Sequence, residues 1–148
     1  MKPHIGKRYT PMRRLALLLL LCTLAVAVSA CEFSASTATI TSADLARGYA
    51  DGKATDVSTT FAPSDTPLHY VVTLGSAPDD TKVKAVWTIV DAGDGQYKDK
   101  MLDQTELQSG SGVLNFTLAG TQAWPVGKYK VDLFLNDKLD RTADFTVQ

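Results

Sequence analysis

Cys31 is the residue whose position in the chain points most clearly to chemistry. It follows the small residues Ser29 and Ala30, at the end of an uncharged run over residues 15–28 made mostly of Leu, Ala and Val. Such a run after a basic segment is typical of a secretory signal peptide, and it is shorter than the roughly 20 apolar residues of a spanning helix. A cut after Ala30 would leave Cys31 as the first mature residue, with a free amine beside its thiol. The basic residues before the run are Lys2, Lys7, Arg8, Arg13 and Arg14.

The segment Val28-Ser29-Ala30-Cys31 resembles the lipid-attachment signal of bacterial lipoproteins. The resemblance implies that residues 1–30 are a cleaved signal peptide, that a diacylglycerol is joined to the Cys31 sulfur, and that the new amine is acylated too. Two acyl chains hold a protein on a membrane stably, whereas one chain holds it reversibly. In an alternative that stays open, an ordinary signal peptidase releases a soluble protein that begins with Cys31. The start of translation is also open, because Met12 begins a compact leader of its own.

The residues after Cys31 bear on where the mature protein would be held. In lipoproteins of bacteria with two membranes, an Asp just after the Cys often retains the protein in the inner membrane, and here that position is Glu32. The resemblance therefore implies export and anchoring to the cell membrane, or to the outer membrane facing the periplasm if the source has one. Residues 31–37 are mostly small and polar, and we interpret them as a flexible tether to one folded domain over residues 38–148.

Charge and cysteine content limit the classes of protein to which the mature chain can belong. Loss of the leader would remove five of the 15 basic residues and none of the 16 acids, which leaves a net charge of −6. Binding of nucleic acid is disfavoured, because phosphate contacts need clustered Lys and Arg. Cys22 lies in the leader and Cys31 would carry lipid, so the sequence predicts a domain without a disulfide, stabilised by its apolar core.

Period-two alternation of apolar and polar residues recurs along residues 38–148, and no stretch shows sustained helical periodicity. Turn residues separate the alternating segments, as at Asp51-Gly52, Asp94-Gly95 and Asn136-Asp137. The pattern predicts an all-β domain, an antiparallel β-sandwich of seven or eight strands, after a cleaved signal peptide. The expected strands cover residues 38–46, 57–61, 68–74, 82–89, 96–101, 113–118, 129–135 and 143–147.

Three aromatic positions give the expected sandwich a family resemblance. Trp87 in a long strand, Tyr129 opening the penultimate strand and a final Asp144-Phe145-Thr146-Val147 look like the immunoglobulin and fibronectin type III sandwiches. The run from Trp124 to Val131 is similar to the entry to the penultimate strand in many bacterial surface Ig-like domains. The resemblance implies an Ig-like fold and no particular activity. The chain departs from antibody domains because it lacks both inter-sheet cysteines.

Few residues after the leader could support catalysis. His69 is the only histidine there, and the alternation places it on the face of its strand away from the core. One histidine cannot supply a zinc site, and the sequence contains no Gly-x-Ser-x-Gly turn. The acidic pairs Asp79/Asp80 and Asp91/Asp94 are expected in turns at opposite ends of one strand. The sequence therefore predicts no catalytic residue, no metal site and no cofactor, and calcium binding by the acidic turns is an alternative that stays open.

Aromatic and outward-facing apolar residues are the candidate binding residues. Val86 and Phe134 are predicted to face away from the core on neighbouring strands, where they could form an exposed partner surface with Val90 and Tyr97. Trp124 precedes Pro125 in a loop, where it either caps the core or stands exposed to a ligand such as a sugar.

These features favour a non-catalytic, lipid-anchored binding module of the cell envelope. The expected partners are the membrane, through the N-terminal lipid, and a protein or an envelope polymer. The first alternative is a small periplasmic inhibitor or immunity-type lipoprotein, which would use the acidic turns. A carbohydrate-binding module and a hydrolase are the remaining alternatives.

Overall fold

The computed structural model describes residues 37–148, so the leader and the predicted lipid-attachment residue Cys31 lie outside the described residues. The described residues form strands and loops, and none of them belongs to a helix long and apolar enough to cross a membrane. The strands are β1 (Thr39–Ala50), β2 (Lys53–Val57), β3 (Thr60–Phe61), β4 (Leu68–Gly75), β5 (Thr81–Ala92), β6 (Tyr97–Ser109), β7 (Gly112–Leu118), β8 (Gly127–Leu135) and β9 (Lys138–Val147).

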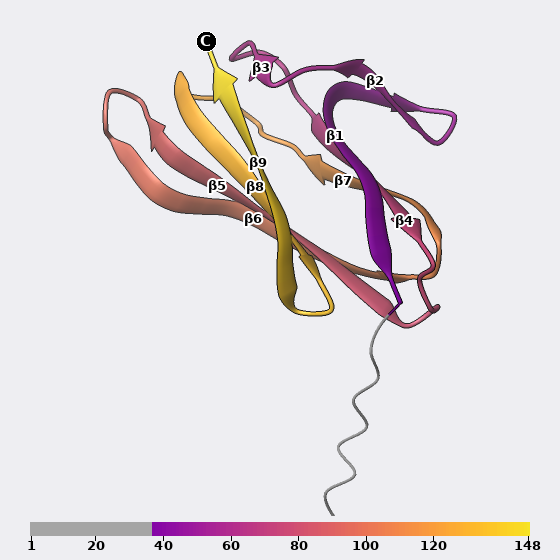
Figure 1. The fold of residues 1–148 in the computed structure, drawn as a ribbon. Helices are drawn as coiled ribbons and strands as arrows, with labels where there is room; N and C mark the ends of the chain where they lie inside the picture. Colours follow the sequence, from indigo (N-terminus) through magenta and orange to yellow (C-terminus); the bar gives the residue numbers. More distant parts are fainter. Residues whose placement is uncertain (1–36) are drawn as a thin grey trace, which may run out of the picture. The chain divides into compact units, whose positions relative to one another are not determined.

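Two sheets face each other across one core (Figure 1). One sheet has the order β2-β1-β4-β7 and the other the order β3-β9-β8-β5-β6. Every neighbouring pair is antiparallel except β3 and β9, which pair in parallel over two residues. The predicted all-β sandwich is therefore confirmed.

The core follows the predicted alternation on the two central strands, β4 and β5. Apolar side chains at every second position point between the sheets, and the polar or smaller residues between them point outward. Trp87 lies at the centre, with its ring 6.2 Å from the ring of Tyr70 and 6.0 Å from that of Phe145, both edge to face. The buried inward residues of β4 and β5 are Leu68, Tyr70, Val72, Leu74, Val83, Ala85, Trp87 and Ile89.

The expected strands were wrong mainly at three edge strands, β2, β3 and β6, and the internal strands β5 and β9 are also longer than expected. The first strand continues to Ala50, and the predicted turn at Asp51-Gly52 leads into β2, a strand that was not expected. The expected strand over residues 57–61 is only β3, and β6 extends to Ser109 instead of ending at Met101. An edge strand has one edge without a partner strand, and often both of its faces are exposed to solvent. Polar residues therefore occupy it, and the alternation that marks a buried strand is lost.

The sandwich has two distinct ends. The chain enters β1 at one of them, where the Thr37 hydroxyl donates a hydrogen bond to the Ser76 carbonyl at 2.7 Å. We call this the Thr37 end, and it also holds the β4–β5 turn with Asp79 and Asp80 and the β8–β9 turn. The opposite end, here the free end, holds residues 62–67, the β5–β6 turn, the 119–126 loop and the C-terminus (Figure 1).

Candidate binding site

A cleft of about 240 Å³ opens at the free end, between the beginning of β6 and the 119–126 loop. Its walls carry the rings of Tyr97 and Trp124, and we call it the Tyr97–Trp124 cleft. Of its lining residues Ile89 is buried, and the polar residues Lys100, Thr121 and Gln122 are exposed at its rim. The other lining residues are Leu102, Gly120, Ala123 and Pro125.

Trp124 is held in one orientation by contacts from two directions. Its indole Nε1 donates a hydrogen bond to the Asp65 carbonyl at 2.7 Å, and its backbone N–H donates to the Pro63 carbonyl at 2.8 Å. Gly120 lies against the ring so closely that a Cβ there would be 2.8 Å from the Trp124 Cη2 atom. The indole is half-buried and packs against the edge of the core. Trp124 therefore both caps the core, as one of the two interpretations expected, and presents part of its ring to the cleft.

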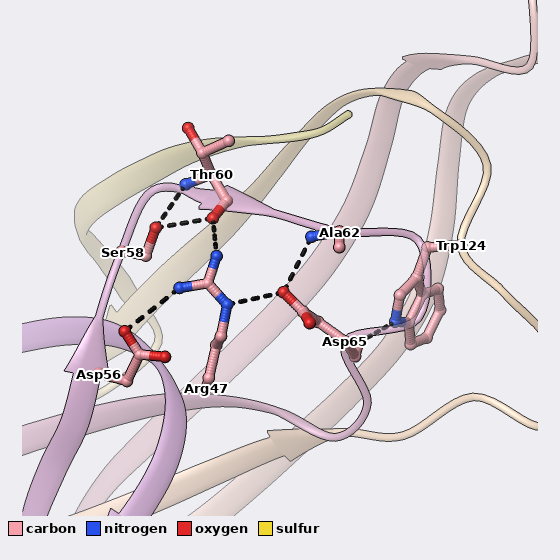
Figure 2. A network of polar contacts seen from close by, with 7 residues as sticks. All are labelled: Arg47, Asp56, Ser58, Thr60, Ala62, Asp65 and Trp124. Atoms are coloured by element: carbon pink, nitrogen blue, oxygen red, sulfur yellow. Dashed lines mark hydrogen bonds and ion pairs between the residues drawn. The ribbon is translucent and has the colours of Figure 1, made fainter.

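A charged network stabilises the segment that holds Trp124 (Figure 2). The Arg47 Nε donates to the Asp65 carboxylate at 2.7 Å, and another guanidinium nitrogen donates to the Thr60 carbonyl at 2.6 Å. The same Asp65 oxygen accepts the Ala62 N–H at 2.8 Å. These two donors, the backbone N–H first and Arg47 second, lower the pKa of Asp65 below its ordinary value of 3.8. Asp65 thus links Arg47, the 62–65 turn and the indole of Trp124.

Replacing Asp65 with asparagine is expected to weaken the acid dependence of stability. The pKa of Asp65 is lower in the folded state than its ordinary value of 3.8. Its carboxylate therefore contributes stability that is present at a pH above that ordinary value and is lost as the pH falls through the pKa of the folded state. In urea titrations wild type should lose free energy of unfolding as the pH is lowered below about 5, and Asp65→Asn should lose less of it. The matched control is Asp56→Asn, which removes the exposed partner of Arg47 and should change stability by less than about 0.5 kcal/mol at neutral pH. An Asp65→Asn variant with the full acid loss of wild type would contradict the prediction.

Tyr97 forms the opposite wall of the cleft. It pairs with the buried Ala92, and its ring lies beside the backbone of Gly93, whose φ is +63°. The Lys100 ammonium is 5.0 Å from the centre of the ring, within the range of a cation–π contact. Tyr97 packs against the core, so it does not share the outer face of the sheet with Val86 as the sequence analysis expected.

The other three residues of the expected partner surface lie on the neighbouring strands β5 and β8. Val86 and Phe134 lie on the outer face, half-buried, and the Lys84 ammonium covers the Phe134 ring at 4.9 Å from its centre. Val90 lies toward the other end of β5, beside a register shift between the strands. The Lys84 side chain therefore covers part of the apolar surface that the alternation predicted, and a partner surface at Val86 and Phe134 stays a prediction. The exposed large apolar residues are Tyr49, Val57, Met101, Val113, Val126 and Leu139.

Val90 instead lines two further hollows, of about 290 and 600 Å³, both also at the free end. Lys128 borders both hollows, and Asp91 and Asp94 border the larger one. The acidic turn at 91–94 thus lies near the cleft, whereas Asp79 and Asp80 lie at the opposite end of β5, as expected. The cleft and the two Val90 hollows, lined by residues within 59–146, lie at the end remote from Thr37.

His69 is placed as a surface residue of the other sheet. One ring nitrogen, Nδ1, lies 3.1 Å from the Asn115 side-chain oxygen, and the ring stacks on Tyr49 with 6.5 Å between centres. Asn115 is not a nucleophile, so this contact does not form the nucleophile–base pair of a hydrolase. Within residues 37–148, no three His, Cys, Asp or Glu side chains are grouped to hold a metal ion.

Tyr129 shows that the resemblance in the sequence reflects a real structural feature. Its hydroxyl donates a hydrogen bond to the carbonyl of Pro125, four residues upstream, at 2.6 Å. This contact at the start of the penultimate strand is the tyrosine corner of immunoglobulin-like sandwiches. It fixes the end of the 119–126 loop against β8, and the loop in turn carries Trp124 into the cleft.

Comparison with solved structures supports the same fold. An immunoglobulin-like protein from Pseudomonas aeruginosa superposes with a TM-score of 0.52 over 78% of this chain and 99% of its own, at 15% sequence identity. At that identity the similarity shows the immunoglobulin-like fold alone. No family model and no curated protein matches the chain.

Proposed function

We propose that this protein is a lipid-anchored, non-catalytic binding module of the bacterial cell envelope, which engages its ligand at the free end of an Ig-like sandwich. One observation carries the proposal: the Tyr97–Trp124 cleft and the two Val90 hollows all lie at the end opposite Thr37. Concave sites lined by aromatic and apolar groups with a few polar groups are typical of ligand binding.

The proposed anchor would hold the protein at the end of the sandwich opposite the cleft. Cys31 lies six residues before Thr37, and six extended residues span at most about 20 Å. A lipid on Cys31 would hold the Thr37 end of the sandwich within that distance of the membrane surface. The free end, where the cleft opens, would then be directed away from the membrane toward other envelope components. With Glu32 after the anchor, we place the protein in the outer membrane, facing the periplasm, if the source has two membranes, and otherwise in the cell membrane.

The anchor is tested by detergent-phase partition and intact-mass analysis of the full chain made in its native cell. Wild type should enter the detergent phase and carry acyl mass on Cys31, and Cys31→Ala should do neither. Cys22→Ala is the matched control, because Cys22 lies in the leader and its loss should leave the acylation unchanged. A soluble wild type with a bare N-terminal Cys31 would refute the anchor.

The binding end is tested by photo-crosslinking in intact cells. A photoreactive residue at Gln122, on the rim of the cleft, is compared with one at Asp137, in the exposed β8–β9 turn at the Thr37 end. We expect a specific adduct from position 122 and none from position 137. Adducts from position 137 alone would show that the partner binds at the Thr37 end, and they would contradict the proposal.

An inhibitor is the second candidate, and the position of the 91–94 turn favours it. This turn projects from the free end beside the larger hollow, and Asp91 and Asp94 border that hollow. If the partner crosslinked from position 122 is an enzyme, we expect the domain to inhibit it. Loss of that inhibition in Asp94→Asn would favour the inhibitor over the binding module. An adduct with a polymer would select the binding module.

A further inference from the structure

We propose that the Tyr97–Trp124 cleft binds a sugar residue that carries a carboxylate, as part of an acidic envelope glycan. This inference rests on the proposed function, because it names the ligand of the same cleft. Three properties of the cleft support it: two aromatic walls, one cationic group and a small volume.

The Trp124 indole suits the face of a pyranose ring, whereas the Tyr97 ring already has the Lys100 ammonium over one face. Tyr97 comes from β6 and Trp124 from the 119–126 loop, so the two rings border the cleft from different elements. A pyranose presents C–H groups on its faces and hydroxyls around its rim, and an aromatic ring offers those faces a broad apolar surface. Because hydrogen bonds to Asp65 and Pro63 and the contact with Gly120 fix the indole, little conformational entropy is lost on binding.

Lys100 selects for a negative charge on the sugar. It is the one charged residue among those that line the cleft, and its ammonium already lies over the Tyr97 ring, 5.0 Å from the centre. A carboxylate next to that ring face would form a charge-assisted hydrogen bond with the ammonium. Thr121 and Gln122 on the rim offer a hydroxyl and an amide to the sugar hydroxyls. Because the expected mature chain has a net charge of −6, attraction of an anion here depends on this local lysine.

The volume limits the ligand to about one ring. At about 240 Å³ the cleft is smaller than the roughly 300–1,000 Å³ of sites that enclose drug-sized ligands. The cleft opens to solvent at the free end, so the neighbouring residues of a polymer can continue outside it. A single acidic residue within a longer glycan fits these dimensions.

The test uses the detergent-solubilised mature protein and two matched probes, a trisaccharide of glucuronic acid and the corresponding trisaccharide of glucose. Tryptophan fluorescence should report binding, because Trp124 borders the cleft whereas Trp87 is enclosed in the core. We expect the acidic trisaccharide to bind at least about tenfold more tightly than the neutral one. Lys100→Gln should remove this preference, and the control Lys138→Gln, in the exposed β8–β9 hairpin, should keep it.

Three outcomes would overturn the inference. They are equal binding of the two trisaccharides, an unchanged preference in Lys100→Gln, and no binding of the acidic trisaccharide by wild type. If crosslinking from position 122 still captures a partner in any of these cases, the proposed function stands and only the identity of its ligand is wrong. If position 122 captures nothing and neither probe binds, both proposals fail together.

Discussion

Replacing Gly127 with alanine is expected to destabilise the domain by about 3 kcal/mol or more. Gly127 begins β8 opposite Ala92, with φ at +157°, a conformation that L side chains rarely adopt. A Cβ at this position would clash with the Asp91 carbonyl oxygen and lie 2.5 Å from the Ala92 Cα atom. Both neighbours belong to the backbone of β5, so relief requires the two central strands to separate. Urea unfolding of wild type and variant measures the loss.

Gly112 is the matched control for this substitution. Its φ is +150°, similar to that of Gly127, but no atom lies within 4 Å of the position that a Cβ would occupy. Gly112→Ala should therefore cost only the backbone strain, about 1–2 kcal/mol. The difference between the two variants isolates the crowding between β5 and β8. Equal losses in the two variants would show that the backbones can separate without cost and would contradict the prediction.

Replacing Trp87 with alanine is expected to cost about 3–5 kcal/mol, a large fraction of the stability of a domain of this size. Trp87 is 1% exposed and makes edge-to-face contacts with Tyr70 and Phe145, which come from opposite sheets. Its removal would leave a cavity at the place where the two sheets meet. The loss should appear as a lower midpoint in urea unfolding with an unchanged slope.

Trp87→Phe is expected to cost less than half as much as Trp87→Ala. The indole Nε1 is buried without a hydrogen-bond partner among the described residues, so the tryptophan itself is destabilised by an unsatisfied donor. Phenylalanine keeps an aromatic ring and removes that donor, and this gain offsets part of the lost volume. If Trp87→Phe is as destabilising as Trp87→Ala, the indole nitrogen contributes to stability and the interpretation is wrong.

The sandwich could be predicted from the sequence because its central strands are buried on one face. On β4 and β8, apolar residues at every second position have one side toward the core, and the period of two survives in the sequence. The turn at Asn136-Asp137 was also predicted, since both residues adopt positive φ and these residue types tolerate it. The edge strands β2, β3 and β6 lack this signal, because water contacts them on more than one side.

The face of Tyr97 could not be predicted, because strand pairing decides it. Two register shifts separate the middle of β5 from its end: one against β6 after Trp87, the other against β8 after Ile89. A single extra residue in a strand moves every later side chain to the other face of the sheet. Alternation counted from Val86 therefore predicts the wrong face of the sheet for Tyr97. No signal in the sequence marks these shifts.

Features that depend on the local order of residues could be inferred from the chain alone. The alternation specifies two apolar faces that must be buried together, and the leader with Cys31 supplies the expectation of export and lipid attachment in one linear segment. That Tyr97 and Trp124 share a cleft, and that this cleft lies at the end opposite Thr37, depends on how the folded strands and loops pack. The reason is that the path of the 119–126 loop depends on contacts distant in the sequence, from the Trp124 indole to the Asp65 carbonyl and from the Trp124 N–H to the Pro63 carbonyl, which form only when the two sheets have packed.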